Sequence, residues 1–416
     1  MGNITNYVGQ PIFSQILSLI DNASIASVCK QHSADKYTKK LTFKDHLTTM
    51  LYTVFSGCTS IREVQTGLEL CAGKLNHFDL KQVPARSTLS DGNKKRSSKV
   101  FGTLYQKLFD RYKGIISDTP MNKELASKLY ILDSTTISLF KAILKPAGRK
   151  RRDGKSKGGI KAHMLLKADS NMPSFVKYSA ASMHDQQFYQ YISVLPENSI
   201  ITFDKAYINY EQFDAFEKRG ITYVVPQKDN ASFTSIKELD LLNDEQQILK
   251  DEIIEVQYKI HIEGVEVKKT LQLRRVAYYS EKHKTPFVYW SNNLDLKAME
   301  IVEIYQCRWQ IETFFKKLKQ NFPLNYFLGD NENAIEIQIW CALIALVLLQ
   351  VLYKENEATI AFTILASIVR LHLMNYVGLT SIIKKYKLKR TRVKKEPPKN
   401  ALKKRIHPQF QPEIQF

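Results

Sequence analysis

Four polar side chains recur along one short stretch of the chain, Ile301–Gln320, at a spacing that would bring them together. The stretch lacks Pro and Gly and is rich in good helix formers, so we predict one continuous helix. At about 100° per residue, four side chains fall within about 60° of one another on that helix: Tyr305, Arg308, Glu312 and Lys319. A carboxylate between two cations can bind a divalent metal while the cations hold phosphate. A plain surface helix with ion pairs four residues apart has the same pattern.

The spacing Tyr-x2-Arg-x3-Glu-x6-Lys resembles the Y-R-E-K signature of bacterial insertion-sequence transposases of the DDE type. These enzymes form a cut-and-paste group with a ribonuclease-H-like catalytic domain. The resemblance implies that Glu312 is a catalytic carboxylate and that two aspartates precede it, each at the end of a strand. It also implies that Arg308 and Lys319 hold DNA phosphates, and that Tyr305 contacts the region of the terminal nucleotide.

Two aspartates match this expectation. Asp133 lies within the apolar, β-rich run Leu129–Leu139, where an acid is costly to bury unless it binds something. Asp204 ends the short apolar strand Ser199–Phe203, and a carboxylate at such a tip faces the crevice where open α/β sheets bind ligands. Family members usually have Asp-x-Gly-Tyr here. Ala206 replaces that glycine, a mild departure that affects the expected shape of the loop.

The chemistry implied by the resemblance is phosphoryl transfer assisted by metal ions. Asp133, Asp204 and Glu312 would hold two Mg²⁺ ions about 3.5–4 Å apart, with Mn²⁺ as a substitute, because oxygen ligands select hard cations. One ion would activate the nucleophile, first water and then a DNA 3′ hydroxyl, and the other would stabilise the leaving oxygen. The expected cycle is nicking at the element ends, a hairpin on the transposon end, its reopening, and strand transfer.

The elements that must position these residues suggest an α/β ribonuclease-H-like core interrupted by a β-rich insertion. We predict the catalytic domain at residues 125–227 and 293–380, with a helical C-terminal region. The insertion is predicted at 228–292, where Glu252–Ile262 alternates strictly between apolar and polar residues. In relatives an aromatic residue of the insertion stacks on a flipped base. The candidates here, for each of which core packing is an equal explanation, are Phe287, Tyr289 and Trp290.

The two ends of the chain are predicted to contact DNA. Residues 1–118 form an all-α N-terminal DNA-binding domain in this prediction, ending with a helix from about Thr88 that Ser87 caps. Basic residues flank that helix and would suit a helix-turn-helix-like binder: Arg86, Lys94, Lys95 and Arg96. A plain helical domain with a solvated basic face is an equal alternative. Residues 381–416 form a basic tail, which we interpret as a disordered arm that makes non-specific DNA contacts.

The amino-acid composition limits the classes of protein to which this chain could belong. The 61 Lys and Arg residues exceed the 41 Asp and Glu residues by 20, which favours a polyanionic partner, most commonly nucleic acid. The five scattered cysteines lack metal-ligand spacing and indicate reduced thiols in a cytosolic protein, and no signal peptide is evident. The apolar stretch Ile335–Leu352 contains an uninterrupted part, Ile339–Leu349, that is too short to span a bilayer. We therefore predict a buried core helix there.

These patterns together predict a DNA transposase that cleaves transposon ends and transfers the strand into target DNA with the help of metal. Its partners would be double-stranded DNA, meaning terminal inverted repeats and target, and a second copy of the chain in a homodimeric synaptic complex. It would act in the cytoplasm, associated with the nucleoid through DNA, and not at a membrane. A metal-dependent DNA nuclease, or a catalytically inactive DNA-binding protein derived from a transposase, would share the same three carboxylates.

Overall fold

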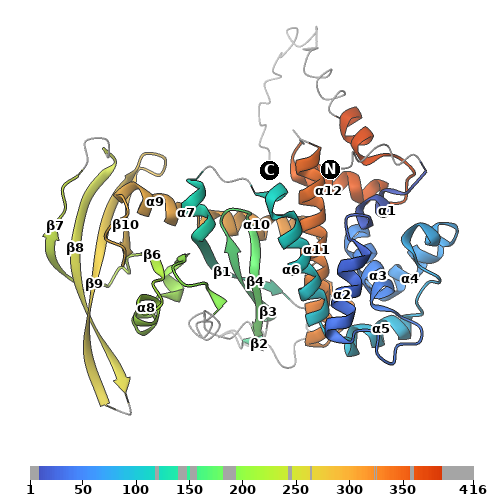
Figure 1. Ribbon diagram of the computed structural model, residues 1–416, viewed down its shortest axis with the longest axis horizontal. Coiled ribbons are helices and arrows are strands. Elements are labelled where there is room, and N and C mark those ends of the chain that lie inside the picture. The colour runs from blue at the N-terminus through green and yellow to red at the C-terminus, as the bar shows by residue number, and fades with distance from the viewer. Residues whose placement is uncertain are drawn as a thin grey trace, which may run out of the picture.

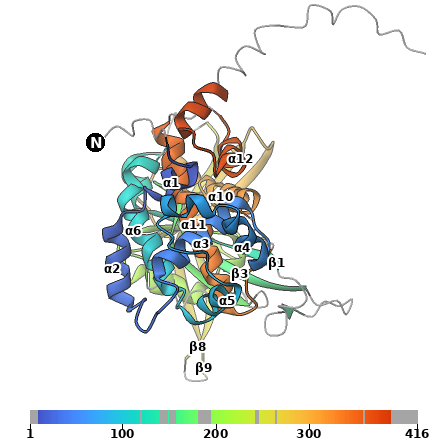
Figure 2. The same ribbon diagram turned by 90° about the vertical axis from the view of Figure 1, so that its right-hand side faces the viewer.

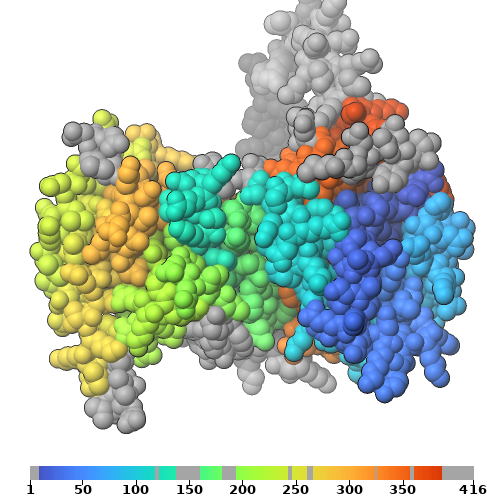
Figure 3. Space-filling view, in the orientation of Figure 1, coloured from blue at the N-terminus to red at the C-terminus, as the bar shows by residue number. Residues whose placement is uncertain are grey.

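Helices gather at one end of the molecule, a β-sheet runs through its middle, and the last strands of that sheet form the other end (Figure 1 and Figure 3). The structure is a computed structural model that describes residues 9–117, 121–138, 148–149, 157–180, 194–241, 246–262, 265–322, 324, 326–356 and 360–386. From residue 387 onward, the predicted basic tail lies outside the described residues.

The N-terminal part is helical, as its apolar spacing predicts. Its helices are α1 (Ile12–Leu17), α2 (Asn22–His32), α3 (Phe43–Ser56), α4 (Ile61–Glu69), the 3₁₀ helix η1 (Ala72–Phe78), α5 (Arg86–Lys95), α6 (Lys99–Ile116) and α7 (Lys123–Lys128). Thr42 and Asp45 form a reciprocal capping box at the start of α3. The predicted cap of α5 is wrong, because the helix begins at Arg86 after Ala85 and Ser87 therefore lies within its first turn.

Ten strands among the described residues join one mixed sheet: β1 (Leu129–Ser138), β2 (Gly148–Arg149), β3 (Lys157–Lys167), β4 (Met172–Ala180), β5 (Ile200–Phe203), β6 (Thr222–Pro226), β7 (Thr234–Glu238), β8 (Ile248–Ile262), β9 (Val265–Ser280) and β10 (Thr285–Ser291). Their order is β2-β3-β1-β5-β6-β10-β9-β8-β7, and β4 pairs with β3. Strand β5 is parallel to β1 and β6, and the other pairs are antiparallel.

The strands of the predicted insertion continue the central sheet. Strand β10 pairs with β6, with Trp290 opposite Val225, so β7 to β10 extend the same sheet. Strands β7, β8 and β9 form the end of the molecule that lies farthest from the N-terminal helices (Figure 1). The predicted insertion is therefore joined to the central sheet by backbone hydrogen bonds, as well as by the chain itself at 228 and 292.

The remaining elements are the 3₁₀ helix η4 (Lys205–Tyr207), α8 (Tyr210–Glu217), α9 (Ala298–Gln306), α10 (Trp309–Asn321), α11 (Glu332–Glu355) and α12 (Phe362–His372). By length and composition alone α11 could cross a membrane, but 83% of its most apolar window is buried inside the protein. It lies among the N-terminal helices in both ribbon views (Figure 1 and Figure 2), and its core is continuous with theirs. The prediction of a buried core helix at 335–352 is confirmed.

The predicted single helix at 301–320 is instead two helices in sequence, α9 and α10. The break occurs where Arg308 N donates to Tyr305 O at 2.9 Å and Gln310 N donates to Cys307 O at 2.9 Å. These bonds span three residues rather than four and tighten one turn into 3₁₀ geometry. Cys307 and Arg308 keep right-handed helical dihedrals, so the chain continues in a helical sense through the break. No Pro or Gly marks this position in the sequence.

Candidate active site

The first two predicted carboxylates lie on neighbouring strands. In the parallel pair β1–β5, Leu132 is opposite Phe203, and Asp133 and Asp204 are the next residues along the two strands. Adjacent strands are about 4.8 Å apart, so the two backbones bring these side chains close together. Asp204 directly follows the end of β5, as predicted. Asp133 does not end its strand, because β1 continues beside β3 as far as Ser138.

Strand alternation points both carboxylates toward the same layer of helices. Ile131, two residues before Asp133, belongs to the core that also contains α9, α10 and α11, whereas Leu132 belongs to the core on the opposite face. Likewise Ile200 is in the first core, and Ile201 is in the second. Side chains two residues apart share a face, so Asp133 projects toward the face covered by α10.

Backbone amides hold both aspartates in place. Ser134 N donates to Asp133 Oδ1 at 2.7 Å, and Lys205 N donates to Asp204 Oδ1 at 2.7 Å. Burial raises the pKa of the Asp133 carboxyl to about 6, against the lowering effects of the Ser134 amide and Arg308. The nearby charges of Asp204 and Glu312 raise that pKa further. The three carboxylates therefore interact electrostatically, and an added cation would relieve their repulsion.

Arg308 connects the third carboxylate to the first. Its Nη1 lies 2.8 Å from Glu312 Oε1 and 3.9 Å from Asp133 Oδ2, and its side chain is buried. The Nε of Arg308 is also buried and makes no hydrogen bond to any residue that the structure describes. The guanidinium is thus a cation between two carboxylates.

Tyr305 and Lys319 flank this cluster. The ring of Tyr305 lies 4.6 Å from that of Tyr289 between centroids, and the Arg308 guanidinium lies 5.7 Å from the Tyr305 centroid. Lys319 Nζ donates to Thr136 O at 3.1 Å, three residues beyond Asp133 on β1. The structure therefore brings Asp133, Arg308 and Glu312 into direct ion pairing, and it places the other predicted residues around them through β-strand pairing, ring packing and a hydrogen bond.

Two buried neighbours of the site were missed by the sequence analysis. His163 lies opposite Ser134 on β3, and its ring nitrogens lie 3.3 Å from Tyr207 Oη and 2.9 Å from Ser179 Oγ. Both His163 and Tyr207 are fully buried, and they connect the turn after Asp204 to strands β3 and β4. The available signal was a lone imidazole within the otherwise apolar run from Ala162 to Leu166, where a buried polar ring needs partners.

The aromatic candidates of the insertion differ in exposure. Trp290 and Tyr289 are 1% and 3% exposed, so both rings are already packed in the protein. Phe287 is half-buried and stacks on Tyr289, with the ring planes 4° from parallel. Tyr289 in turn contacts Tyr305, so these rings connect the insertion to the carboxylate cluster. Contact between any of them and a flipped base stays a prediction.

The predicted metal ligands are neighbours but are not assembled for a metal. Among the described residues, no three Asp, Glu, His or Cys side chains form a ready metal-binding group. The physical reason is that Arg308 pairs with Asp133 and Glu312, while like charges separate the carboxylates. The donor set itself fits a hard divalent cation, because it offers carboxylate oxygens only. Asp133, Asp204 and Glu312 are the residues that could hold such an ion.

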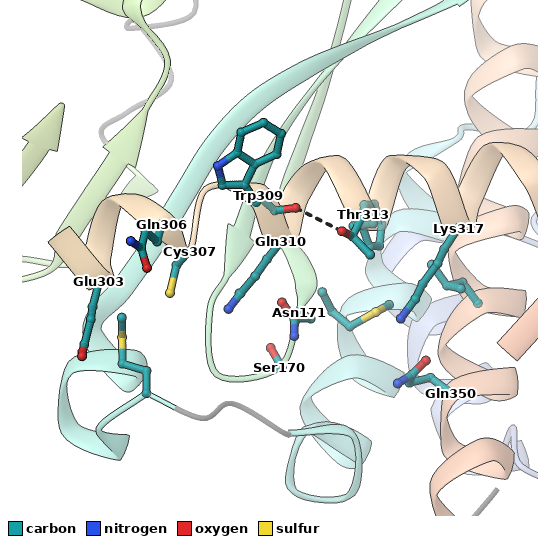
Figure 4. Close-up of a pocket in the computed structure, with 14 residues that line it drawn as sticks. Ser170, Asn171, Glu303, Gln306, Cys307, Trp309, Gln310, Thr313, Lys317 and Gln350 are labelled. Atoms are coloured by element: carbon teal, nitrogen blue, oxygen red, sulfur yellow. Dashed lines mark hydrogen bonds between the residues drawn. The ribbon is translucent and has the colours of Figure 1, made fainter. Parts of the chain in front are cut away.

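A separate cavity of about 520 Å³ lies on the other side of α9 and α10 (Figure 4). Gln306, Gln310, Thr313 and Lys317 line it from the helices, facing Asn171 in the turn between β3 and β4. None of the six predicted site residues lines this cavity. Around the helix axis, the residues that line the cavity are rotated by roughly half a turn from the stripe that includes Glu312. The cavity and the predicted site therefore lie on different faces of the helix.

Comparison with known proteins decides the family. Residues 125–348, more than half of the chain, match the family described as Transposase DDE domain, and this span contains all six predicted site residues. The chain belongs to this transposase family. Residues 8–81 of the transposase match a second family, a domain of unknown function.

Two individual relatives are described as transposases too. The transposase is 26% identical over 279 residues to y4zB of Sinorhizobium fredii, a protein described as a transposase. The alignment covers 66% of this chain and 74% of the relative. It is 24% identical over 229 residues to the protein of insertion sequence IS5377 from Geobacillus stearothermophilus, covering 55% of this chain and 58% of the relative. A cryo-EM structure of the piggyBac transposase synaptic complex with hairpin DNA aligns with a TM-score of 0.41 at 12% identity, over 96% of this chain and 84% of that chain.

Proposed function

We propose that this transposase cleaves DNA at transposon ends and transfers the freed strand into target DNA, using Asp133, Asp204 and Glu312 as its catalytic carboxylates. The observation that carries the proposal is the convergence of three acids that are remote in the sequence. β-Strand pairing sets Asp133 beside Asp204, and Arg308 joins Asp133 to Glu312. Burial raises the pKa of Asp133, and a shifted carboxyl group beside two other acids is typical of a catalytic site.

Each residue has a distinct task in this proposal. The three carboxylates would hold two Mg²⁺ ions, or Mn²⁺ as a substitute, and bound ions would supply charge stabilisation for in-line displacement at phosphorus. Arg308 would offer its guanidinium to a DNA phosphate, which is a bidentate partner like a carboxylate. Lys319 adds a second cation beside β1, and Tyr305 supplies a ring next to the terminal nucleotide.

The finer features of the family belong to the same proposal. A ribonuclease-H-like core is supported by the antiparallel strands β4, β3 and β1 followed by the parallel strands β5 and β6. Cut-and-paste transposition through a hairpin on the transposon end, with two copies of the chain acting on paired inverted repeats in the bacterial cytoplasm, follows from the resemblance of the Y-R-E-K residues. Residues 1–118 and 228–292 would then serve as DNA-binding domain and insertion.

The test compares acids of the site with acids outside it. Glu312→Gln and Asp204→Asn should each lower Mg²⁺-dependent cleavage and joining of a duplex carrying the flanking inverted repeats by about 10²-fold or more, since metal charge stabilisation is worth several kcal/mol. Matched controls are Glu303→Gln on the exposed side of α9 and Asp229→Asn, an exposed acid after β6. Both controls should retain wild-type rates.

Other results would assign a different class. Cleavage of the duplex without any joined product would indicate a metal-dependent nuclease. Wild-type DNA binding with no metal-dependent cleavage, and with no difference between Asp204→Asn and Asp229→Asn, would indicate a catalytically inactive DNA-binding protein. Loss of activity in the controls to the same extent as in the site variants would contradict the assignment of these carboxylates.

A further inference from the structure

A groove lined with cations crosses the helical end of the molecule, between the segment Ser33–Leu41 and helix α5. Its volume is about 730 Å³. Residues of the segment, which follows α2, and residues of α5 line it together. We call this feature the basic groove and define it by its charged lining residues together with Tyr37: Lys36, Tyr37, Lys39, Lys40, Asp91, Lys95 and Arg96.

The charge of the basic groove is strongly one-sided. Lys36, Lys39 and Lys40 are exposed on the segment, and Lys95 is exposed on α5. The one carboxylate among the lining residues, Asp91, is 2.9 Å from Lys95 and is therefore already paired. Like charges gathered on one surface repel one another, and a polyanion that enters the groove relieves this repulsion while it releases its own counterions.

The segment is held in one shape by hydrogen bonds from Arg96 and to Asp35. The Arg96 guanidinium donates to Leu41 O at 2.7 Å and to Thr42 O at 3.2 Å, and it pairs with Asp35 at 3.2 Å. Asp35 also accepts from Phe43 N at 2.6 Å. Arg96 therefore serves as a structural brace, and the three lysines are displayed on a preorganised loop that loses little entropy when it binds.

Tyr37 lies at the tip of this loop in an unfavourable conformation. Its side chain is 90% exposed and its φ is +61°, a region that bulky residues rarely adopt. Lys36 Nζ lies 5.2 Å from the centroid of its ring. The exposed Tyr37 ring contributes almost nothing to the stability of the fold, although its backbone adopts the strained left-handed conformation. This strain points to a role in binding rather than in folding.

We propose that the basic groove binds the phosphodiester backbone of duplex DNA, with Lys36, Lys39 and Lys40 on phosphates and the Tyr37 ring against a deoxyribose. The proposal rests on the proposed function, which requires duplex DNA, and it assigns a task to a region that otherwise matches a domain family of unknown function. The contacts come from the loop that Arg96 braces. Phosphate contacts of this kind position a duplex without reading its sequence.

Salt dependence measures the number of phosphate contacts. The full-length triple variant Lys36→Gln/Lys39→Gln/Lys40→Gln should bind a labelled duplex with a slope of log affinity against log salt reduced by about 2.7, because each phosphate contact contributes about 0.9. Its Kd should rise about tenfold or more at moderate salt. The matched control is Lys113→Gln/Lys123→Gln/Lys218→Gln, which removes the same charge from exposed lysines outside the groove and should keep the wild-type slope.

A second variant separates binding from folding. Tyr37→Gly removes the ring and suits a positive φ, so its melting temperature should be unchanged or higher while its affinity for duplex DNA falls. A wild-type slope in the groove variant, an equal loss in both triple variants, or unchanged binding by Tyr37→Gly with intact fold would each overturn the proposal. Equal loss of binding to heparin and to DNA would assign the groove to polyanions in general and also overturn it.

The two proposals fail in different ways. If the wild-type protein cleaves and joins DNA but the groove triple variant keeps its slope, the groove assignment is wrong and the catalytic assignment stands. If the groove triple variant loses slope but Glu312→Gln cleaves as well as the wild type, the groove assignment stands and the catalytic assignment is wrong.

Discussion

At the scale of single residues, Asp133 shows the energetic cost of the site. Its side chain is 20% exposed, and burial together with two neighbouring acids raises its pKa to about 6. An acid whose pKa is higher in the folded state than in the unfolded chain destabilises the fold once it ionises. The penalty is absent below about pH 4, grows as the pH rises toward 6, and is complete above that value.

Replacing this carboxylate should therefore stabilise the protein at neutral pH. Asp133→Asn should raise the free energy of unfolding at pH 7.5 in the presence of a chelator by up to about 3 kcal/mol, because it removes the buried charge while its amide oxygen can still accept from Ser134 N. Thermal denaturation between pH 4 and pH 8 measures the effect, which should disappear near pH 4. A gain that is independent of pH would show that the carboxylate charge is not its source. The variant should also lack cleavage activity.

At the scale of elements, a buried ion pair ties the extended part of the sheet to the start of α9. Arg274 on β9 makes two hydrogen bonds to the carboxylate of Asp251 on β8, at 2.9 and 2.6 Å. The same guanidinium donates to the carbonyls of Leu294 and Leu296, which lie just before α9. The position of the helix that carries Tyr305 therefore depends on strands from the predicted insertion.

Breaking one side of this pair should be more harmful than replacing both. Asp251→Ala leaves a buried guanidinium without its carboxylate and should cost about 3–5 kcal/mol in the free energy of unfolding. Adding Arg274→Met should recover part of that loss, so urea denaturation of the two single variants and the double variant should give a non-additive cycle. Additive losses would contradict the coupling. The exposed pair Lys205–Asp229 is the control, and its loss should cost less than about 1 kcal/mol.

At the scale of the whole molecule, α11 makes the helical end and the sheet one folding unit. Asn333 in its first turn donates to Asn93 O at 2.8 Å and to Arg96 O at 2.7 Å, at the end of α5. Trp340 packs on Tyr105 of α6 and on Tyr178 of β4, with centroids 5.5 and 6.2 Å apart. The helix thus contacts both the N-terminal helices and the sheet.

The catalytic part should therefore not fold alone. A fragment of residues 125–386 exposes the apolar surface of α11 that the N-terminal helices cover, so it should aggregate or lack a cooperative unfolding transition. The full chain should unfold in a single transition. Size-exclusion chromatography and circular dichroism of the two proteins measure this difference. A soluble fragment with its own cooperative transition would show instead that the domain boundary near residue 118 is also a boundary of folding.

Sequence alone determined what depends on near neighbours along the chain. Apolar runs and alternation predicted β1, β5 and β8, because the period of side-chain burial is a property of local backbone geometry. Uninterrupted apolar character predicted α11 as a core helix. The family resemblance, rather than any pattern of charge, directed attention to Asp133 and Asp204.

Tertiary structure decided what depends on contacts between remote segments. The register of β1 against β5 sets Asp133 beside Asp204, and the packing of α10 brings Arg308 between the acids. The break before Trp309 and the brace that Arg96 forms have no local signal, since each is stabilised by partners far away in the chain. Periodicity describes which face of a segment is buried, whereas pairing and packing determine which other segment buries it.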